Sequence, residues 1–124
     1  MVEQDYITRK IRELVRVLLR MLFNMNTGTP SPALLKEEAA REILNGLLEK
    51  VSAGNIDEAE NRLYGILEEH SYENLQIALL FYSHLNDLSE EYLIEHDFSH
   101  EEIKDGLTEL VSRYGLNDMV EVFL

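Results

Sequence analysis

The chain has 124 residues, of which 45% are hydrophobic and 28% charged, and it contains no cysteine. This length suits one domain with its own core, and the composition fits neither a disordered nor a transmembrane protein. Without cysteine there is no disulfide, thiolate nucleophile or cysteine-ligated zinc, so we expect a cytoplasmic protein. The apolar run over residues 14–23 contains two arginines and precedes no cleavage site, so we expect neither a signal peptide nor a membrane span.

Charge is distributed unevenly along the chain, whose formal net charge is -13. Up to Thr27 there are five basic and three acidic residues, a balance of +2, and the remaining six basic and 21 acidic residues sum to -15. The two parts can attract each other. Nucleic-acid binding is disfavoured, because the one basic stripe has no interleaved aromatic residue except Phe23.

Apolar residues recur at intervals of three and four along almost the whole chain, which predicts an all-α protein, a compact bundle of about six helices. We expect a single domain over residues 1–124, with a basic amphipathic N-terminal helix in 1–26 and an acidic helical-hairpin region in 32–124. The first helix is expected from about Asp5 to between Asn24 and Asn26, before a loop with the sequence NTGTPSP.

The second helix is expected to begin at Pro32, capped by Ser31, and to run to about Ser52. Gly54 suits the left-handed residue that ends such a helix. The predicted inner face consists of apolar residues at helical spacing: Leu35, Ala39, Ile43, Leu47, Leu48 and Val51.

The third helix is expected to start at a capping-box-like pair, Asn55 and Glu58, and to end near His70. Its predicted inner face is Ile56, Ala59, Leu63, Ile66 and Leu67. A fourth helix follows Ser71, and the pattern leaves open whether it continues through Asp87 or restarts there. Its predicted inner face is Leu75, Ala78, Leu79, Tyr82 and Leu85.

A second capping box, Ser99 with Glu102, is expected to open a fifth helix, which Gly115 ends before a short tail helix. Its predicted inner face is Ile103, Leu107, Leu110 and Val111. Gly65 and Gly106 fall inside predicted helices, where glycine costs about 1 kcal/mol relative to alanine. Each is interpreted either as a close helix contact or as a tolerated neutral placement.

The segment GNIDEAENRLYGILEEHS, from Gly54 to Ser71, resembles the middle of a tetratricopeptide repeat. Such repeats recur about every 34 residues and need about three copies to bury a continuous core. The nearest second copy, HDFSHEEIKDGL, begins 42 residues later, from 54 to 96, and has Ile103 at the position of the crossing alanine. We therefore predict one tetratricopeptide-like helical hairpin in the middle of the chain rather than a regular array.

Two further segments, QDYITRKI near the start and NIDEAENRLY in the middle, resemble an uncharacterised family of small, all-helical bacterial proteins. This family is carried mostly by Firmicutes and has no assigned activity. The resemblance implies an all-helical cytoplasmic protein. It carries over no catalytic residue, because the shared motifs are packing motifs.

The histidines are the only side chains here with both metal-ligand and general-base potential near neutral pH: His70, His84, His96 and His100. A di-metal site of the helical-bundle type needs a glutamate three residues before histidine, and none is present there. The cap Ser99 separates His96 from His100, so one helix face is not expected to present both. We expect no metal site and no cofactor, with the histidines exposed or capping.

Catalytic patterns are also missing from the sequence. Adjacent glutamates recur four times, but neighbours on a helix point about 100° apart, so no such pair shares a face. There is no phosphate-binding loop, dinucleotide fingerprint or nucleophile elbow. We expect no catalytic residue and no enzyme activity.

The first helix holds the candidate interaction surface. Residues 7, 11, 14, 18, 21 and 25 follow steps of four and three, which is a heptad seam, and four arginines lie on the opposite side. The apolar arc is wider than one core contact needs, and Leu19 and Phe23 extend it toward the arginines. We therefore expect the helix to pack on its own domain and also to form an interface in a homodimer or with another protein. The expected interface residues are Ile7, Ile11, Leu14, Leu18, Met21, Leu22 and Met25.

The function predicted from these patterns is a non-enzymatic helical module for protein–protein interaction or self-association. The alternative is a peripheral adaptor that binds a membrane surface through the basic N-terminal helix. Glu13 and repulsion between an anionic surface and the -15 remainder weaken that alternative. A small-ligand binder or enzyme is less favoured still.

Overall fold

The computed structural model of the chain describes residues 2–24 and 35–120. These residues form α-helices joined by turns, with no strand among them, so the all-α prediction is confirmed. The helices are α1 (Val2–Phe23), α2 (Glu38–Ser52), α3 (Ile56–Ile66), α4 (Tyr72–Asn86), α5 (Glu90–Glu95), α6 (His100–Arg113) and α7 (Asn117–Val120). Within the described residues, no helix combines the length and the apolar character needed to cross a lipid bilayer.

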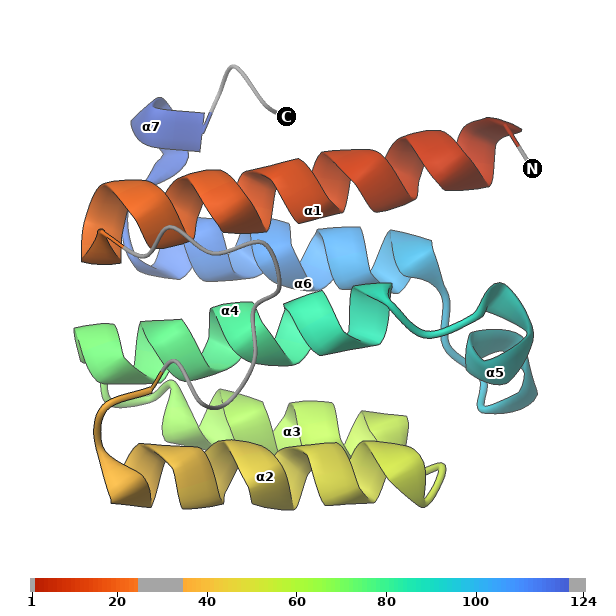
Figure 1. The fold of residues 1–124 in the computed structure, drawn as a ribbon, viewed down its shortest axis with the longest axis horizontal. Helices are drawn as coiled ribbons and strands as arrows, with labels where there is room; N and C mark the ends of the chain where they lie inside the picture. The colour runs from red at the N-terminus through yellow and green to blue at the C-terminus, as the bar shows by residue number, and fades with distance from the viewer. Residues whose placement is uncertain (1, 25–34, 121–124) are drawn as a thin grey trace.

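Helix α4 lies at the centre of the bundle. Figure 1 shows α1 at the top, α2 and α3 at the bottom, and α4 and α6 between them. α4 packs against α1, α2 and α6. Its sequence is apolar on nearly every side, which is typical of a buried helix, and the large side chains Phe81 and Tyr82 are fully buried.

Helix α2 begins later than the sequence predicted. It starts at Glu38, and Glu37 before it has extended backbone, with φ -80° and ψ 129°. The expected start at Pro32 is therefore wrong, because Leu35 to Glu37 are not helical. The expected cap Ser31 and Pro32 itself lie outside the described residues.

The inner face of α2 also differs from the prediction. Ala40 and Leu44 are buried, whereas Ala39 and Ile43 are exposed. Residues 40, 44, 47 and 51 follow steps of four, three and four and share one face. Residues 39 and 43 each lie one position earlier, about 100° around the helix, so the predicted face combined two different sides.

The expected start of the first helix at about Asp5 is wrong, because α1 already begins at Val2, and it ends at Phe23, just before the expected end. Most of the other predicted helix ends are confirmed. The Ser71 hydroxyl accepts a hydrogen bond from the Asn74 N–H, and the Ser99 hydroxyl accepts one from the Glu102 N–H. Gly54 and Gly115 have positive φ angles of 89° and 65°. At Gly54 the His96 ring occupies the space beside the backbone, and an added Cβ would lie 2.6 Å from it.

The ends of α3 and of α4 could not be predicted correctly from the sequence. α4 ends at Asn86, and α5 restarts with the Ser89 hydroxyl accepting from the Tyr92 N–H, which decides the alternative left open at Asp87. α3 begins after Asn55 as predicted, but the Asn55 side chain makes no capping bond. α3 ends at Ile66 rather than near His70. α2 and α3 pack as neighbouring helices, and their likeness to a tetratricopeptide repeat stays a prediction.

Candidate functional site

The interface residues predicted on α1 lie mainly inside the bundle. Ile11, Leu14 and Leu18 are at most 3% exposed, and Ile7 and Leu22 are partly buried. Met21 is 56% exposed, and Met25 lies outside the described residues. Because α1 packs on both α4 and α6, two internal neighbours use its wide apolar arc.

The two apolar residues expected to extend this arc toward the arginines also have internal partners. Leu19 is buried, and the Phe23 ring packs edge-on against the Tyr72 ring at 6.1 Å between centroids. The width of the arc is therefore explained within the chain. It is no longer evidence for a second copy.

Polar contacts fix the N-terminal half of α1 to the end of α4. The buried Asn86 donates from Nδ2 to the carbonyl oxygen of Thr8 at 2.9 Å. A nitrogen of the Arg12 guanidinium lies 3.8 Å from a carboxylate oxygen of Asp87. These contacts, together with the apolar packing on α4 and α6, set the position of this half of α1 in the bundle.

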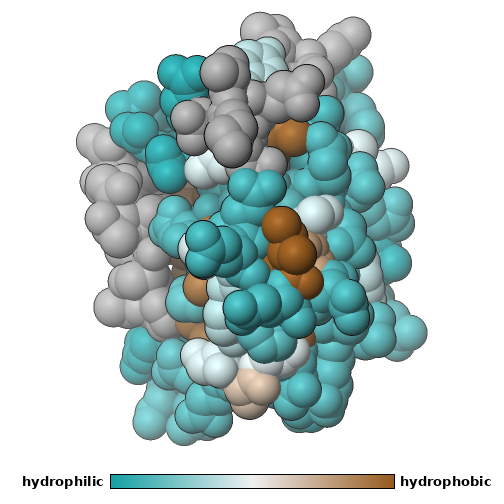
Figure 2. Space-filling view, turned by 90° about the vertical axis from the view of Figure 1, so that its right-hand side faces the viewer, coloured by the Kyte–Doolittle hydropathy of each residue, from teal (hydrophilic) through white to brown (hydrophobic). Residues whose placement is uncertain are grey.

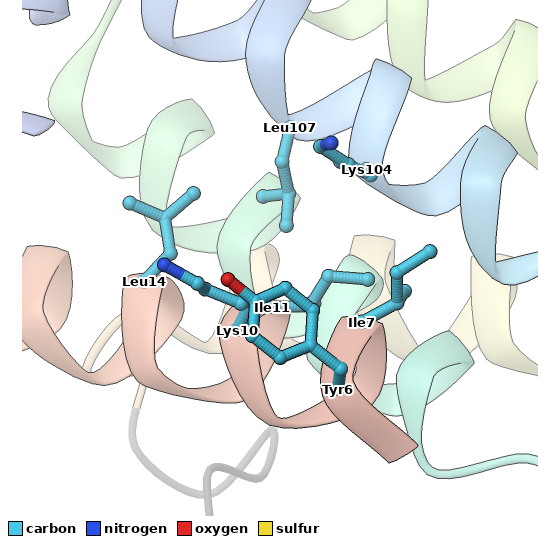
Figure 3. A pocket seen from close by; sticks show the side chains of 7 residues that line it. All are labelled: Tyr6, Ile7, Lys10, Ile11, Leu14, Lys104 and Leu107. Carbon is cyan, nitrogen blue, oxygen red and sulfur yellow. The ribbon is translucent and has the colours of Figure 1, made fainter. Parts of the chain in front are cut away.

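A cleft opens between this half of α1 and α6 (Figure 3). Its apolar lining comes from both helices: Ile7, Ile11, Leu14 and Leu107. The polar residues that line it are Tyr6, Lys10 and Lys104. Figure 3 shows Tyr6 and Lys10 next to each other on α1, with Lys104 on the facing helix α6.

The cleft is a basic spot on an acidic protein. The Lys10 Nζ lies 5.5 Å from the centroid of the Tyr6 ring, within the range of a cation–π interaction. Both lysines are exposed, and Tyr6 is 55% exposed. Ammonium groups beside apolar surface attract a carboxylate more strongly than ammonium groups in open water, because the neighbouring surface is of low polarity.

The cavity in the cleft is small, with a volume of about 70 Å³. Pockets for metabolites and drug-sized molecules usually measure about 300–1,000 Å³. Even benzene occupies an engineered cavity of about 150 Å³. The cavity therefore suits one aliphatic side chain better than a whole small molecule.

A second hollow, of about 410 Å³, lies between α3 and α6. Its lining is mostly acidic: Glu60, Tyr64, Glu102, Asp105, Gly106, Glu109 and Arg113. The Tyr82 hydroxyl donates to Oε2 of Glu60 at 2.7 Å. Burial raises the pKa of Glu60, and the hydrogen bond from Tyr82 partly opposes this. Burial also raises the pKa of Tyr82, and the neighbouring Glu60 carboxylate adds to the effect.

The two glycines noted inside helices have different surroundings. A Cβ added at Gly106 would lie 2.5 Å from the Tyr82 hydroxyl oxygen, so this glycine permits a close contact between α4 and α6. A Cβ added at Gly65 would meet nothing within 4 Å. Gly46 in α2, which the sequence did not single out, has the same open surroundings.

The four histidines lie in separate environments. His70 packs near Tyr114, with ring centroids 5.6 Å apart, and His96 has Nδ1 2.8 Å from the Tyr92 carbonyl oxygen. Burial lowers the pKa of the half-buried His84 at the end of α4. His100 was expected to be exposed or capping, but it is buried, with Nε2 3.4 Å from the Asn86 carbonyl oxygen. In the described part of the chain, no group of three or more His, Asp or Glu residues could hold a metal ion.

Four of the seven residues that line the cleft stand on predicted apolar faces, and Leu107 is the one among them that comes from α6. Ile7, Ile11 and Leu14 belong to the predicted seam, but Tyr6, Lys10 and Lys104 were not singled out. Tyr6 and Lys10 are four residues apart and flank the seam, a signal that was available. Nothing in the local sequence indicates that Lys104 lies opposite them.

The chain matches one protein family over most of its length. Residues 1–115 match the model described as a family of unknown function, DUF6483. The chain belongs to this family. Neither the curated proteins nor the solved structures gave a match. The match covers every residue that lines the cleft, and the family description supplies no activity.

Proposed function

We propose that this protein is a non-enzymatic helical module that binds another protein through the cleft between α1 and α6. The observation that carries the proposal is the cavity of side-chain size flanked by Lys10 and Lys104 in a chain of net charge -13. Protein interfaces often centre on one side chain seated in a desolvated pocket, with polar groups around it. The partner segment carries one apolar side chain next to an aspartate or glutamate.

The alternatives have less support. A membrane adaptor would need apolar side chains on the solvent face of α1, and most of its apolar residues are buried in the core or packed against it. Among the described residues of α1, the large hydrophobic side chains that are strongly exposed are those of Tyr6 and Met21. A small-ligand binder or enzyme would need a larger cavity than the cleft offers. The larger hollow between α3 and α6 is lined mostly by acidic residues rather than by the apolar residues typical of ligand pockets.

Panning a random peptide library on the full chain tests this function. We expect enriched peptides to contain Leu, Ile or Met within two positions of an acidic residue. A synthetic consensus peptide should bind more weakly as salt rises and should shift the amide NMR signals of the residues that line the cleft.

Matched variants separate the cleft from general charge attraction. Replacing both lysines, Lys10→Ser with Lys104→Ser, should weaken peptide binding at least about tenfold. The control, Arg16→Ser with Arg20→Ser, also removes two exposed positive charges but leaves the cleft intact, and it should bind within about twofold of the unchanged protein. Equal losses in the two variants, or no enriched motif, would reject the proposal.

A further inference from the structure

Helix α5 presents an exposed isoleucine among carboxylates. Ile94 is 61% exposed, Glu90 and Glu91 lie one helical turn before it, and Glu95 follows it. All three glutamates are exposed. Figure 2 views the molecule from the side on which α5 lies, and this surface is mostly hydrophilic with a small hydrophobic group near its centre.

The short helix α5 is firmly attached to the rest of the molecule. Leu93, next to Ile94, is fully buried in the core. The Tyr92 hydroxyl donates to the carbonyl oxygen of Val51 at 2.5 Å. Because Leu93 and Tyr92 anchor α5 to the rest of the molecule, the backbone that carries the exposed Ile94 is held in place, which reduces the entropy lost when a partner binds it.

Ile94 and the cleft match in size and in charge. A single aliphatic side chain suits the cavity of about 70 Å³, and the surrounding glutamates complement Lys10 and Lys104. We propose that a second copy of this chain occupies the cleft, with its Ile94 in the cavity and its glutamates against the two lysines. This rests on the function proposed above, because it names the partner for the same cleft.

Other exposed hydrophobic residues fit the cleft less well. In the described part of the chain, the large ones are Tyr6, Met21, Ile43, Tyr72 and Ile94. Tyr6 lines the cleft itself, Met21 follows Arg20, and Tyr72 packs on the Phe23 ring. Ile43 lies in a groove that contains both basic and acidic side chains. Ile94 combines strong exposure with three exposed glutamates close to it on the same short helix.

The contact can close with two-fold symmetry because the cleft and Ile94 lie at the same end of the molecule. Figure 1 shows α5 at the end of the bundle where α1 begins, and the bond from Asn86 to Thr8 ties the end of α4 to that part of α1. In a two-fold pair each copy inserts its Ile94 and receives that of the other copy, so two identical contacts form together. Such an isologous arrangement stops at a dimer.

Light scattering coupled to size exclusion tests the dimer. Over about 10 µM to about 1 mM, the mass should rise from 14.4 kDa toward twice that value, 28.8 kDa. Ile94→Ser should raise the dissociation constant at least about tenfold, because it removes a buried aliphatic group from both contacts. The control Ile43→Ser changes an equally apolar residue that is 40% exposed on α2, and it should leave the dissociation constant unchanged.

A charge exchange tests the pairing itself. One variant carries Lys10→Glu and Lys104→Glu, and the other carries Glu91→Lys and Glu95→Lys. Each should be monomeric alone, whereas an equimolar mixture should regain dimers, because both contacts again join opposite charges. The net charges become -13 - 4 = -17 and -13 + 4 = -9, so general attraction between the variants cannot explain the recovery.

Three results would overturn the self-association. They are a mass of 14.4 kDa at every concentration, a dimer that Ile94→Ser leaves intact, and two folded exchange variants that do not associate. A consensus peptide that still binds the cleft in any of these cases would leave the proposed function standing with a different protein partner. Loss of both peptide binding and dimer would remove both proposals.

Discussion

The α1 side and the α2–α3 side of the bundle expose different kinds of residues. Both α1 and α2 pack on α4 and on one further helix, so each uses its buried face to contact two helices of the core. The solvent face of α1 carries arginines with long side chains, whereas that of α2 carries Ala39, Ile43 and Gly46. Most apolar residues on α1 are thus explained by the core, with Tyr6 and Met21 as exposed exceptions, while the exposed small and apolar residues of α2 are not.

Glycine shows the same contrast. Gly106 in α6 faces the Tyr82 ring closely, so its missing side chain serves the packing of the core. Gly46 in α2 and Gly65 in α3 face open space, where the backbone freedom of glycine only weakens the helix. The α1–α6 side is therefore closely packed around its glycine, and the α2–α3 side has room to be stabilised.

The largest expected effect separates core from surface on α1. Leu18→Asp places a charge at a fully buried position, and we expect a loss of more than about 4 kcal/mol with unfolding of the chain. The control is Arg16→Asp, which places the same side chain at an exposed position two residues away and should leave the protein folded. Circular dichroism measures both. A Leu18→Asp variant that stays helical and only loses an interface would show that this seam serves a second copy instead of the core.

The next effect concerns the contact between α4 and α6. Gly106→Ala would place its Cβ 2.5 Å from the Tyr82 hydroxyl oxygen, so the ring or the helix must move. We expect a loss of about 1–3 kcal/mol in the free energy of unfolding. Urea titration followed by circular dichroism gives this value. An unchanged urea midpoint would mean that the two helices are less closely packed than the structure shows.

On the opposite side the same substitution should have the opposite sign. Gly46→Ala and Gly65→Ala each add a methyl group where nothing lies within 4 Å. Each should raise the free energy of unfolding by about 0.5–1 kcal/mol, because alanine favours the helix. The double variant should be near the sum, since the sites lie on different helices. Destabilisation at either site, measured by the same titration, would contradict the open surroundings.

Local signals in the sequence predicted the helix ends better than the surfaces. Ser71, Ser99 and Gly115 act on backbone groups a few residues away, so their role can be read from neighbouring residues. The inner face of α2 was partly wrong because two adjacent faces both carry apolar residues. Only packing on α3 and α4 decides that Leu44 is buried and Ile43 is not.

The apolar periodicity of α1 predicts a buried face but not the helices that it contacts. From Ile7 to Leu18 the heptad seam correctly indicated which side of α1 is covered, whereas Met21 is exposed, and a repeat of apolar residues does not say what covers it. Here α4 and α6 cover it. Lys10 and Lys104 come together only because α1 packs beside α6, a contact between residues far apart in the sequence. The cleft therefore had to be found in the structure.

The smallest expected effect tests the hollow on the α3 side through its pH dependence. Burial raises the pKa of Glu60 above its ordinary value of 4.5, so ionising this carboxyl disfavours the folded state. Its contribution to stability is full below the unfolded pKa and is lost as the pH rises through the folded pKa.

Glu60→Gln, which can still accept the bond from Tyr82, should therefore raise the melting temperature at pH 7. The gain should vanish at pH values below about 3, where Glu60 is protonated in both states. The control Glu69→Gln changes an exposed glutamate and should show no such pH-dependent gain. A Glu60→Gln variant that melts lower than the unchanged protein at pH 7 would show that the ionised carboxylate, held by Tyr82, stabilises the junction of α3, α4 and α6.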